Sequence, residues 1–196
     1  MKRIDALRAV HGMLDEVVVV TIMGAVAAEL QEVGHRPNFF YLQHAMGLAS
    51  SMGLGIALAR PELKVVVFDG DGSLLMNLGV LTTMARYAPG NLTHVVFDNE
   101  SLLSVGGFPT ATATGSDLAA IARGAGLGAV QRVDAIDGFA KSVRSALAGE
   151  ELATIVAKVE PTGPKGFVTD LGLLENRFAF ARHVQRMGVR KGERRE

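Results

Sequence analysis

The sequence predicts an α/β protein in which a doubly wound parallel sheet carries helices on both faces. Residues 17–22, 64–68 and 92–97 are predominantly apolar runs, the pattern of strands that are buried on both sides. These runs alternate with segments of helical character, and such alternation is typical of a parallel sheet covered on both faces. The length of 196 residues suits one domain with a substantial core.

The first half of the chain supplies the first three strands. Charged side chains near the start, with apolar ones between them, indicate an amphipathic helix rather than a signal peptide. Apolar strands and helices then alternate. In chain order we expect helix 4–14, strand 17–22, helix 25–32, strand 39–42, helix 45–59 and strand 64–68.

The second half continues the alternation. A Gly-Asp-Gly-Ser turn follows the third strand, a Pro-Gly pair precedes the fourth, and a loop rich in Gly, Thr and Pro follows it. In chain order we expect helix 74–87, strand 92–97, helix 116–124, strand 129–133, helix 136–148 and strand 154–159. Residues 1–160 would then form the domain, and residues 161–196 an arm and helix that pack on the domain or a partner.

The helix expected over residues 45–59 carries small residues at every fourth position. They share one face of that helix and permit close approach of another backbone. Two alternatives stay open, packing on the chain's own sheet and packing at a subunit interface. The small residues are Gly47, Ser51, Gly55 and Ala59.

Composition narrows the classes of function. The chain has 20 basic and 20 acidic residues, so it has no general attraction to nucleic acid or to anionic membranes. It has no cysteine, which excludes disulfides, zinc thiolates and iron–sulfur clusters. The apolar run over residues 17–26 is too short to span a bilayer. We expect a cytoplasmic protein with neither a nucleic-acid nor a membrane partner.

Two polar residues directly follow buried strands. Asp71 comes after the run 65–68, and Asn99 after the run 95–97, with about thirty residues between them, the size of a strand–helix–strand unit. If the two strands are neighbours, their carboxyl ends lie roughly 5 Å apart. An Asp carboxylate and an Asn carbonyl suit Mg²⁺ or Ca²⁺, and Mg²⁺ usually keeps coordination sites for substrate phosphates.

The turn that carries Asp71 also suits an anion. A helix is expected to start there, and its free N–H groups and dipole favour negative charge. Gly70 and Gly72 allow close backbone approach, and Ser73 can cap the helix or donate to a phosphate oxygen. A diphosphate bridged to magnesium therefore fits this turn better than a lone metal.

Several stretches together resemble the thiamine diphosphate enzymes. The pattern Gly-Asp-Gly-Ser, then a helix, then an Asn at the end of the next strand carries the resemblance. More closely, the chain is similar to the small, diphosphate-binding subunit of sulfopyruvate decarboxylase and to the matching C-terminal part of phosphonopyruvate decarboxylase. The stretches that carry it are residues 45–55, 68–77 and 104–110, with a weaker match at 175–178.

The resemblance implies a role for each motif residue. Asp71 and Asn99 would coordinate Mg²⁺ through their side chains, and Ser101 through its backbone carbonyl. Met46 would be the apolar wedge that bends the cofactor, and the carbonyl of His44 would receive the pyrimidine amino group. The implied cofactor-binding residues are Gly24, His44, Met46, Gly70, Gly72, Ser73 and Ser104.

Four positions depart from the family pattern. Glu100 stands where the family usually has Gly, and Leu102 and Leu103 stand where polar residues are common. The leucines predict a more apolar substrate wall, which favours a substrate with an uncharged side chain. His44 stands where the relatives usually carry a small residue, and it is either a general acid–base, with an unperturbed pKa near 6.5, or a cap for the helix expected to begin at Ala45.

The resemblance also implies a partner. In this family a Glu on a pyrimidine-binding domain activates the cofactor. We expect one doubly wound sheet to account for the length of this chain, so a second domain of that kind does not fit within it. We therefore expect a hetero-oligomer, α2β2 or larger, with a separate pyrimidine-domain subunit, and decarboxylation of a small 2-oxo acid. The alternatives are a carboligase subunit of acetolactate-synthase type, a non-catalytic cofactor-binding or scaffold subunit and, more distantly, a Rossmann dinucleotide enzyme.

Overall fold

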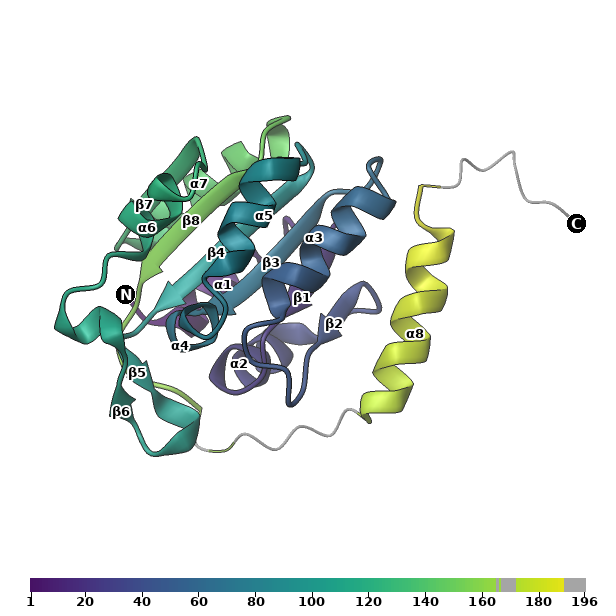
Figure 1. Ribbon diagram of the computed structural model, residues 1–196. Helices are drawn as coiled ribbons and strands as arrows, with labels where there is room; N and C mark the ends of the chain where they lie inside the picture. The colour runs from purple at the N-terminus through teal and green to yellow at the C-terminus, as the bar shows by residue number, and fades with distance from the viewer. Residues whose placement is uncertain (165, 167–171, 189–196) are drawn as a thin grey trace, which may run out of the picture.

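The computed structural model describes residues 1–164, 166 and 172–188, and its centre is a six-stranded sheet (Figure 1). The strand order is β2-β1-β3-β4-β8-β7, and every neighbouring pair is parallel. This topology confirms the expected α/β fold class. The strands are β1 (Val18–Thr21), β2 (Phe39–Tyr41), β3 (Val65–Gly70), β4 (Leu92–Asp98), β7 (Ala129–Val133) and β8 (Ala153–Lys158).

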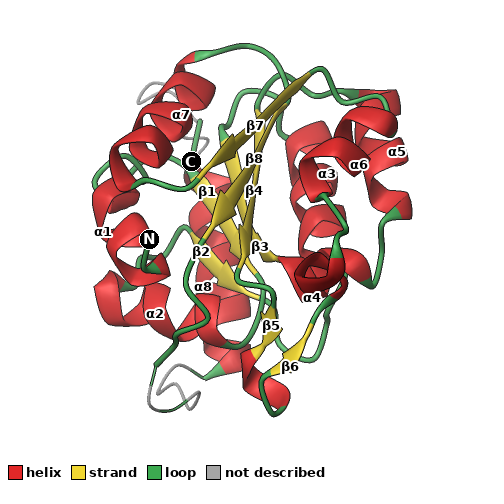
Figure 2. Cartoon of the chain, turned by 90° about the vertical axis from the view of Figure 1, so that its left-hand side faces the viewer, coloured by secondary structure: helices red, strands yellow, loops and turns green. Residues whose placement is uncertain are grey.

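Helices cover both faces of this sheet (Figure 2). On one face lie α1 (Arg3–His11), α2 (Ala25–Gly34) and α7 (Ile136–Ala148), and on the other lie α3 (Ala49–Ala59), α5 (Gly79–Tyr87) and α6 (Leu118–Gly124). The central strands are buried because both of their faces meet a helical layer: all seven residues of β4 are buried. No helix within the described residues has both the length and the apolar character needed to cross a bilayer.

A C-terminal helix, α8 (Leu173–Arg186), stands beside the edge strand β2 (Figure 1). The buried Asn176 of this helix accepts a hydrogen bond from the Tyr41 N–H at 3.1 Å and donates to the Phe39 carbonyl at 2.8 Å. The Asn176 side chain thus provides hydrogen-bond partners for one N–H and one carbonyl group on the open edge of β2. Parts of the segment 161–196 expected to form the arm and helix, namely residues 165, 167–171 and 189–196, lie outside the described residues.

The expectation of one continuous helix over residues 74–87 is wrong. The structure has a short helix α4 (Asp71–Leu75) and then α5, with a break at residues 76–78. Asn77 lies in the break, and its side chain donates to the Gly47 carbonyl at 2.9 Å. This hydrogen bond connects the break to a loop that is thirty residues away in the sequence. The break in the helix therefore depends on a tertiary contact rather than on the local sequence.

The start expected at Ala45 for the next helix is also wrong, because α3 begins at Ala49. His44 (φ +53°) and Gly47 (φ +81°) have left-handed backbones, which a helix does not accommodate. The N-cap residue is Leu48, so His44 does not cap the helix.

The stripe of small residues on α3 does not pack on the chain's own sheet along its whole length. The glycine of α3 that packs on the sheet is Gly53, since a Cβ there would collide with Val67. Gly55 and Ala59, two members of the stripe, are exposed. This outcome disfavours the first of the two alternatives for the stripe.

The loop after β4 is more ordered than its Gly-, Thr- and Pro-rich sequence suggests. It forms a small antiparallel hairpin of β5 (Ser101–Leu102) and β6 (Phe108–Pro109). Two short 3₁₀ helices, Leu103–Val105 and Ala111–Thr114, flank the second strand. The hairpin lies at the carboxyl end of the sheet (Figure 1), where it folds residues of this loop back toward α4.

Candidate cofactor site

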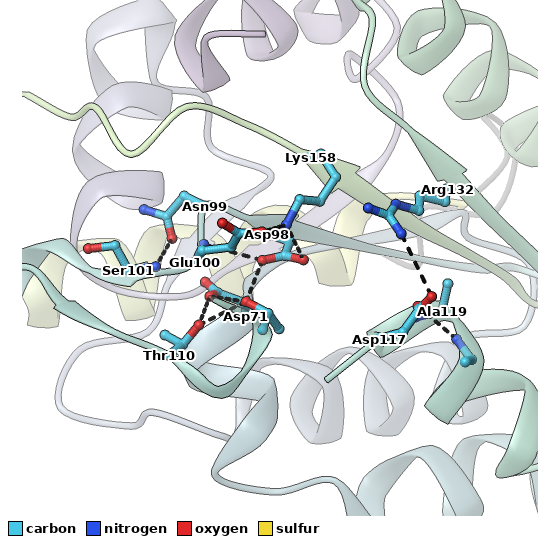
Figure 3. Close-up of polar contacts among 12 residues, drawn as sticks. Asp71, Asp98, Asn99, Glu100, Ser101, Thr110, Asp117, Ala119, Arg132 and Lys158 are labelled. Atoms are coloured by element: carbon cyan, nitrogen blue, oxygen red, sulfur yellow. Dashed lines mark hydrogen bonds and ion pairs between the residues drawn. The ribbon is translucent and has the colours of Figure 1, made fainter. Parts of the chain in front are cut away.

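Asp71 and Asn99 follow the tips of two adjacent parallel strands. The register of β3 and β4 pairs Gly70 with Phe97, so both residues leave the sheet at the same edge. Both are buried, with exposed fractions of 3 % for Asp71 and 6 % for Asn99. The juxtaposition expected from the sequence is therefore present in the fold. Asn99 Oδ1 accepts a hydrogen bond from the Ser101 N–H at 3.2 Å, which orients the amide (Figure 3).

Two threonines from the following loop hold the Asp71 carboxylate. Thr110 Oγ1 donates to Asp71 Oδ2 at 2.6 Å, and Thr112 Oγ1 lies 3.2 Å from the same oxygen (Figure 3). Burial raises the pKa of Asp71; the Thr110 hydrogen bond opposes this shift, and the nearby Asp98 carboxylate adds to it. A divalent cation at this carboxylate would relieve both unfavourable effects.

A lysine balances the second carboxylate of the site. Lys158 Nζ lies 2.9 Å from Asp98 Oδ2 and 2.6 Å from Glu100 Oε1, while Thr112 Oγ1 lies 2.8 Å from Asp98 Oδ1. Partial burial alone would lower the pKa of Lys158, but its bonds to Glu100 and Asp98 prevail and raise it. Glu100 itself has a left-handed backbone (φ +59°), the conformation for which Gly is the favoured residue.

The glycine-rich turn packs tightly against neighbouring loops. A Cβ at Gly72 would collide with the Leu102 side chain, so glycine lets the hairpin approach the start of α4. Ser73 Oγ accepts a hydrogen bond from the Gly47 N–H at 3.0 Å. Its own hydroxyl proton stays available for a phosphate oxygen.

A cavity at this edge of the sheet brings most of the predicted site residues together. It is lined by residues of α1, the β1–α2 connection, α2, the loop before α3, β3, α4, β4 and the loop after β4, and Leu102 and Leu103 form part of its wall. The predicted residues that line it are Met46, Gly70, Asp71, Gly72, Ser73, Asn99, Ser101 and Ser104. Carboxylate, amide and carbonyl oxygens thus meet hydroxyl and backbone donors, a set that fits a magnesium diphosphate.

Two predicted residues do not line this cavity. Gly24 lies just beside it, because a Cβ at Gly24 would come within 3.3 Å of Ser104 Oγ. Its backbone is left-handed (φ +80°), which explains why glycine stands there. His44 is exposed and is not among the residues that line the cavity.

Some polar residues around the site escaped the sequence analysis. Arg3, at the start of α1, lines the cavity. Thr112 and Lys158 lie far from Asp71 in the sequence and join its network only through the fold. Thr110 ends a stretch that carries the family resemblance, so that stretch was a signal that could have drawn attention to it.

Fold and cavity together define an α/β domain with a cavity at the carboxyl ends of its strands, which is where sheets of this kind generally bind ligands. A family model described as "Thiamine pyrophosphate enzyme, C-terminal TPP binding domain" matches residues 21–157. The chain belongs to this family of thiamine pyrophosphate enzymes, and the resemblance inferred from its motifs is confirmed.

Curated relatives agree with this membership. The chain is 36 % identical over 186 residues to a protein of Methanocaldococcus jannaschii named sulfopyruvate decarboxylase subunit beta, covering 94 % of this chain and 98 % of that one. It is 41 % identical over 143 residues to a phosphonopyruvate decarboxylase of Streptomyces hygroscopicus, covering 73 % of this chain and 35 % of the relative.

Solved structures extend the likeness of fold. The benzoylformate decarboxylase structure from Polynucleobacter necessarius superposes with a TM-score of 0.64 at 20 % identity, covering 82 % of this chain and 33 % of that one. This likeness concerns the fold. The predicted enzyme class, a subunit of a thiamine diphosphate-dependent decarboxylase, is confirmed by the family and the curated relatives.

Proposed function

We propose that this chain is the diphosphate- and magnesium-binding subunit of a thiamine diphosphate-dependent 2-oxo acid decarboxylase. The observation that carries the proposal is the shared cavity of Asp71, Asn99 and the Gly72–Ser73 turn in a member of this family. When bound, thiamine diphosphate supplies the electron sink that stabilises the carbanion left by loss of carbon dioxide. The chain's own residues bind and orient it.

Asp71 and Asn99 would hold Mg²⁺, together with the backbone carbonyl of Ser101. Within the described residues no three His, Cys, Asp or Glu side chains gather into an all-protein metal site. A cation at Asp71 would therefore take its other oxygens from carbonyl groups and from the diphosphate, the usual arrangement for Mg²⁺. Thr110 orients Asp71 by occupying Oδ2, which leaves Oδ1 for the cation.

The remaining predicted residues would hold the diphosphate and the rest of the cofactor. Gly72, Ser73 and Ser104 would donate to the diphosphate, with Gly24 and Gly70 allowing its close approach. Met46, whose flexible thioether suits an irregular apolar surface, would be the apolar residue that supports the bent cofactor. His44 would contribute its backbone carbonyl only when a partner completes the site, since the histidine is exposed in this chain.

A separate pyrimidine-domain subunit would complete the enzyme as a hetero-oligomer, α2β2 or larger. Support comes from coverage: the chain spans 98 % of a relative named as a beta subunit but 35 % of a phosphonopyruvate decarboxylase. Residues 1–160 would form the cofactor domain, and residues 161–196 the arm and helix. We place the assembly in the cytoplasm.

The test combines binding with reconstitution. Calorimetry of the full chain with thiamine diphosphate should detect weak, Mg²⁺-dependent binding that Asp71→Ala abolishes and that Asp137→Ala, an exposed control on α7, leaves intact. Decarboxylation of 2-oxo acids should require the co-encoded pyrimidine-domain subunit. Turnover by the single purified chain, or unchanged cofactor affinity in Asp71→Ala, would contradict the proposal.

A further inference from the structure

Arg3 is a buried cation in the wall of the cofactor cavity, outside every motif that the family resemblance uses. Its exposed fraction is 3 %, although it is the first residue of the surface helix α1. Among the described residues that line the cavity, only Arg3 and Asp71 carry a formal charge. A buried arginine is stable only when its charge is paired or hydrogen-bonded, and beside a cavity the partner can be a protein group, a ligand or both.

The guanidinium of Arg3 is fixed from two sides. Its Nε donates to Glu29 Oε2 at 2.8 Å, and its Nη2 donates to Glu29 Oε1 at 3.1 Å and to the Thr162 carbonyl at 3.1 Å. This side-on pairing occupies one edge of the guanidinium. Nη1, on the other edge, has no hydrogen-bond partner among the described residues.

The backbone around Arg3 is fixed as well. The Glu160 N–H donates to the Met1 carbonyl at 2.9 Å, which fastens the start of the chain to the end of β8. Gly163 passes close by, since a Cβ there would lie 3.7 Å from Arg3 Nη2 and 3.6 Å from Ala25 Cβ. Arg3 therefore lies beside the start of α2 in a preorganised position.

We propose that Arg3 binds the diphosphate of the cofactor through its Nη1 edge, an inference that rests on the function proposed above. Ala25, at the start of α2, and Ser104 line the same cavity as Arg3. The two segments lie close together, since a Cβ at Gly24 would come within 3.3 Å of Ser104 Oγ. Arg3 therefore shares the cavity with other groups that can donate hydrogen bonds to an anion. Mg²⁺ neutralises only part of the diphosphate charge, and a planar guanidinium is well suited to phosphate oxygens.

Glu29 gives this inference its sharpest test. If Arg3 only joins α1 to α2 through its ion pair with Glu29, then substituting either residue should change the affinity for pyrophosphate in the same direction. A diphosphate-binding Arg3 predicts opposite effects, because Glu29 offsets the positive charge that the ligand would meet. Glu29→Gln removes the negative charge and keeps one oxygen that can accept from Arg3, while its amide NH2 replaces the second of the two accepting oxygens.

In the experiment, inorganic pyrophosphate and Mg²⁺ are titrated into the full chain. Binding is measured by calorimetry and by the shift in Tm that the ligand causes. Arg3→Met is made in the Glu29→Gln background, so that no unpaired carboxylate stays buried. Glu29→Gln should bind as well as the natural chain or more tightly. The double variant should bind at least about tenfold more weakly, the loss expected for one charge-assisted hydrogen bond. Arg8→Met, on the exposed face of α1, is the matched control and should change nothing.

The outcomes separate this inference from the proposed function. Equal affinity of Glu29→Gln and the double variant, with binding lost in Asp71→Ala, would overturn the role of Arg3 and leave the proposed function standing. Equal loss of affinity in Glu29→Gln and in the double variant would assign Arg3 a structural role and also overturn the inference. No binding of magnesium pyrophosphate by the natural chain at millimolar concentration would count against both.

Discussion

Thr110 and Asp71 are 39 residues apart in the sequence, yet Thr110 Oγ1 donates to Asp71 Oδ2 at 2.6 Å. The hydroxyl fixes one carboxylate oxygen, so the other can face the cavity in a defined direction. Substitution of a group that orients a metal ligand typically lowers metal affinity by about 10- to 100-fold. The hairpin loop that carries Thr110 is thus part of the candidate metal site.

Thr110→Val should weaken Mg²⁺ binding without unfolding the protein. The substitution keeps the shape of the side chain and removes the hydrogen bond to Asp71, and we expect the Mg²⁺ concentration for half-maximal cofactor binding to rise about tenfold. A titration of Mg²⁺ at fixed thiamine diphosphate measures this. Thr114→Val, an exposed change in the same loop, is the control. An unchanged Mg²⁺ midpoint in Thr110→Val would argue that the hydroxyl orients nothing.

Asp71→Asn should raise the Tm of the ligand-free protein at pH 7. The pKa of Asp71 is raised in the fold, chiefly by burial. Between the unfolded pKa and the higher folded pKa the folded state binds more protons, so the free energy of unfolding falls as pH rises through that window and stays reduced above it. A neutral amide removes this penalty.

The same variant should lose its Mg²⁺-dependent stabilisation, since the ligand charge is gone. Calorimetric scans with and without Mg²⁺ and thiamine diphosphate measure both effects. A lower Tm in the ligand-free scan would show that the ionised carboxylate stabilises the fold, against our expectation.

Asn176→Ala should destabilise the fold by about 2–3 kcal/mol. The variant leaves the Tyr41 N–H and the Phe39 carbonyl of the edge strand without their partner, and unpaired buried polar groups are costly. Urea unfolding measures the loss, with Gln185→Ala, an exposed change on the same helix, as the control. Equal midpoints for the two variants would mean that α8 does not protect the sheet edge.

The apolar wall of the cavity leads to a prediction about substrate. Leu102 and Leu103 line the cavity, and the sequence predicts that they form an apolar wall for the substrate. The reconstituted pair should therefore prefer 2-oxo acids with uncharged side chains, measured as kcat/KM across a series that includes sulfonate and phosphonate analogues. A preference for sulfopyruvate over aliphatic and aromatic 2-oxo acids would reject this prediction.

Local patterns in the sequence were sufficient to predict the sheet and the edge at which the cavity lies. The apolar runs before Asp71 and Asn99 place both residues at strand ends, and the spacing between them fits a parallel pair, which the register of β3 and β4 confirms. The fold class and the family followed from the same residues.

Features set by tertiary contacts could not be predicted in this way. The break at Asn77 depends on the distant Gly47 carbonyl, and nothing near Arg3 in the sequence indicates that Glu29 will bury it beside the cavity. Lys158 likewise meets Asp98 only because β8 pairs with β4. These contacts join residues far apart in the chain, so no local periodicity records them.

The most direct test of the central claim is a crystal structure of this chain with Mg²⁺, thiamine diphosphate and its partner subunit. We predict one cation bound by Asp71 Oδ1, Asn99 Oδ1 and the Ser101 carbonyl, with the diphosphate between that cation and the start of α2. A cofactor bound elsewhere, or a bound cofactor whose cation contacts neither Asp71 nor Asn99, would contradict the account.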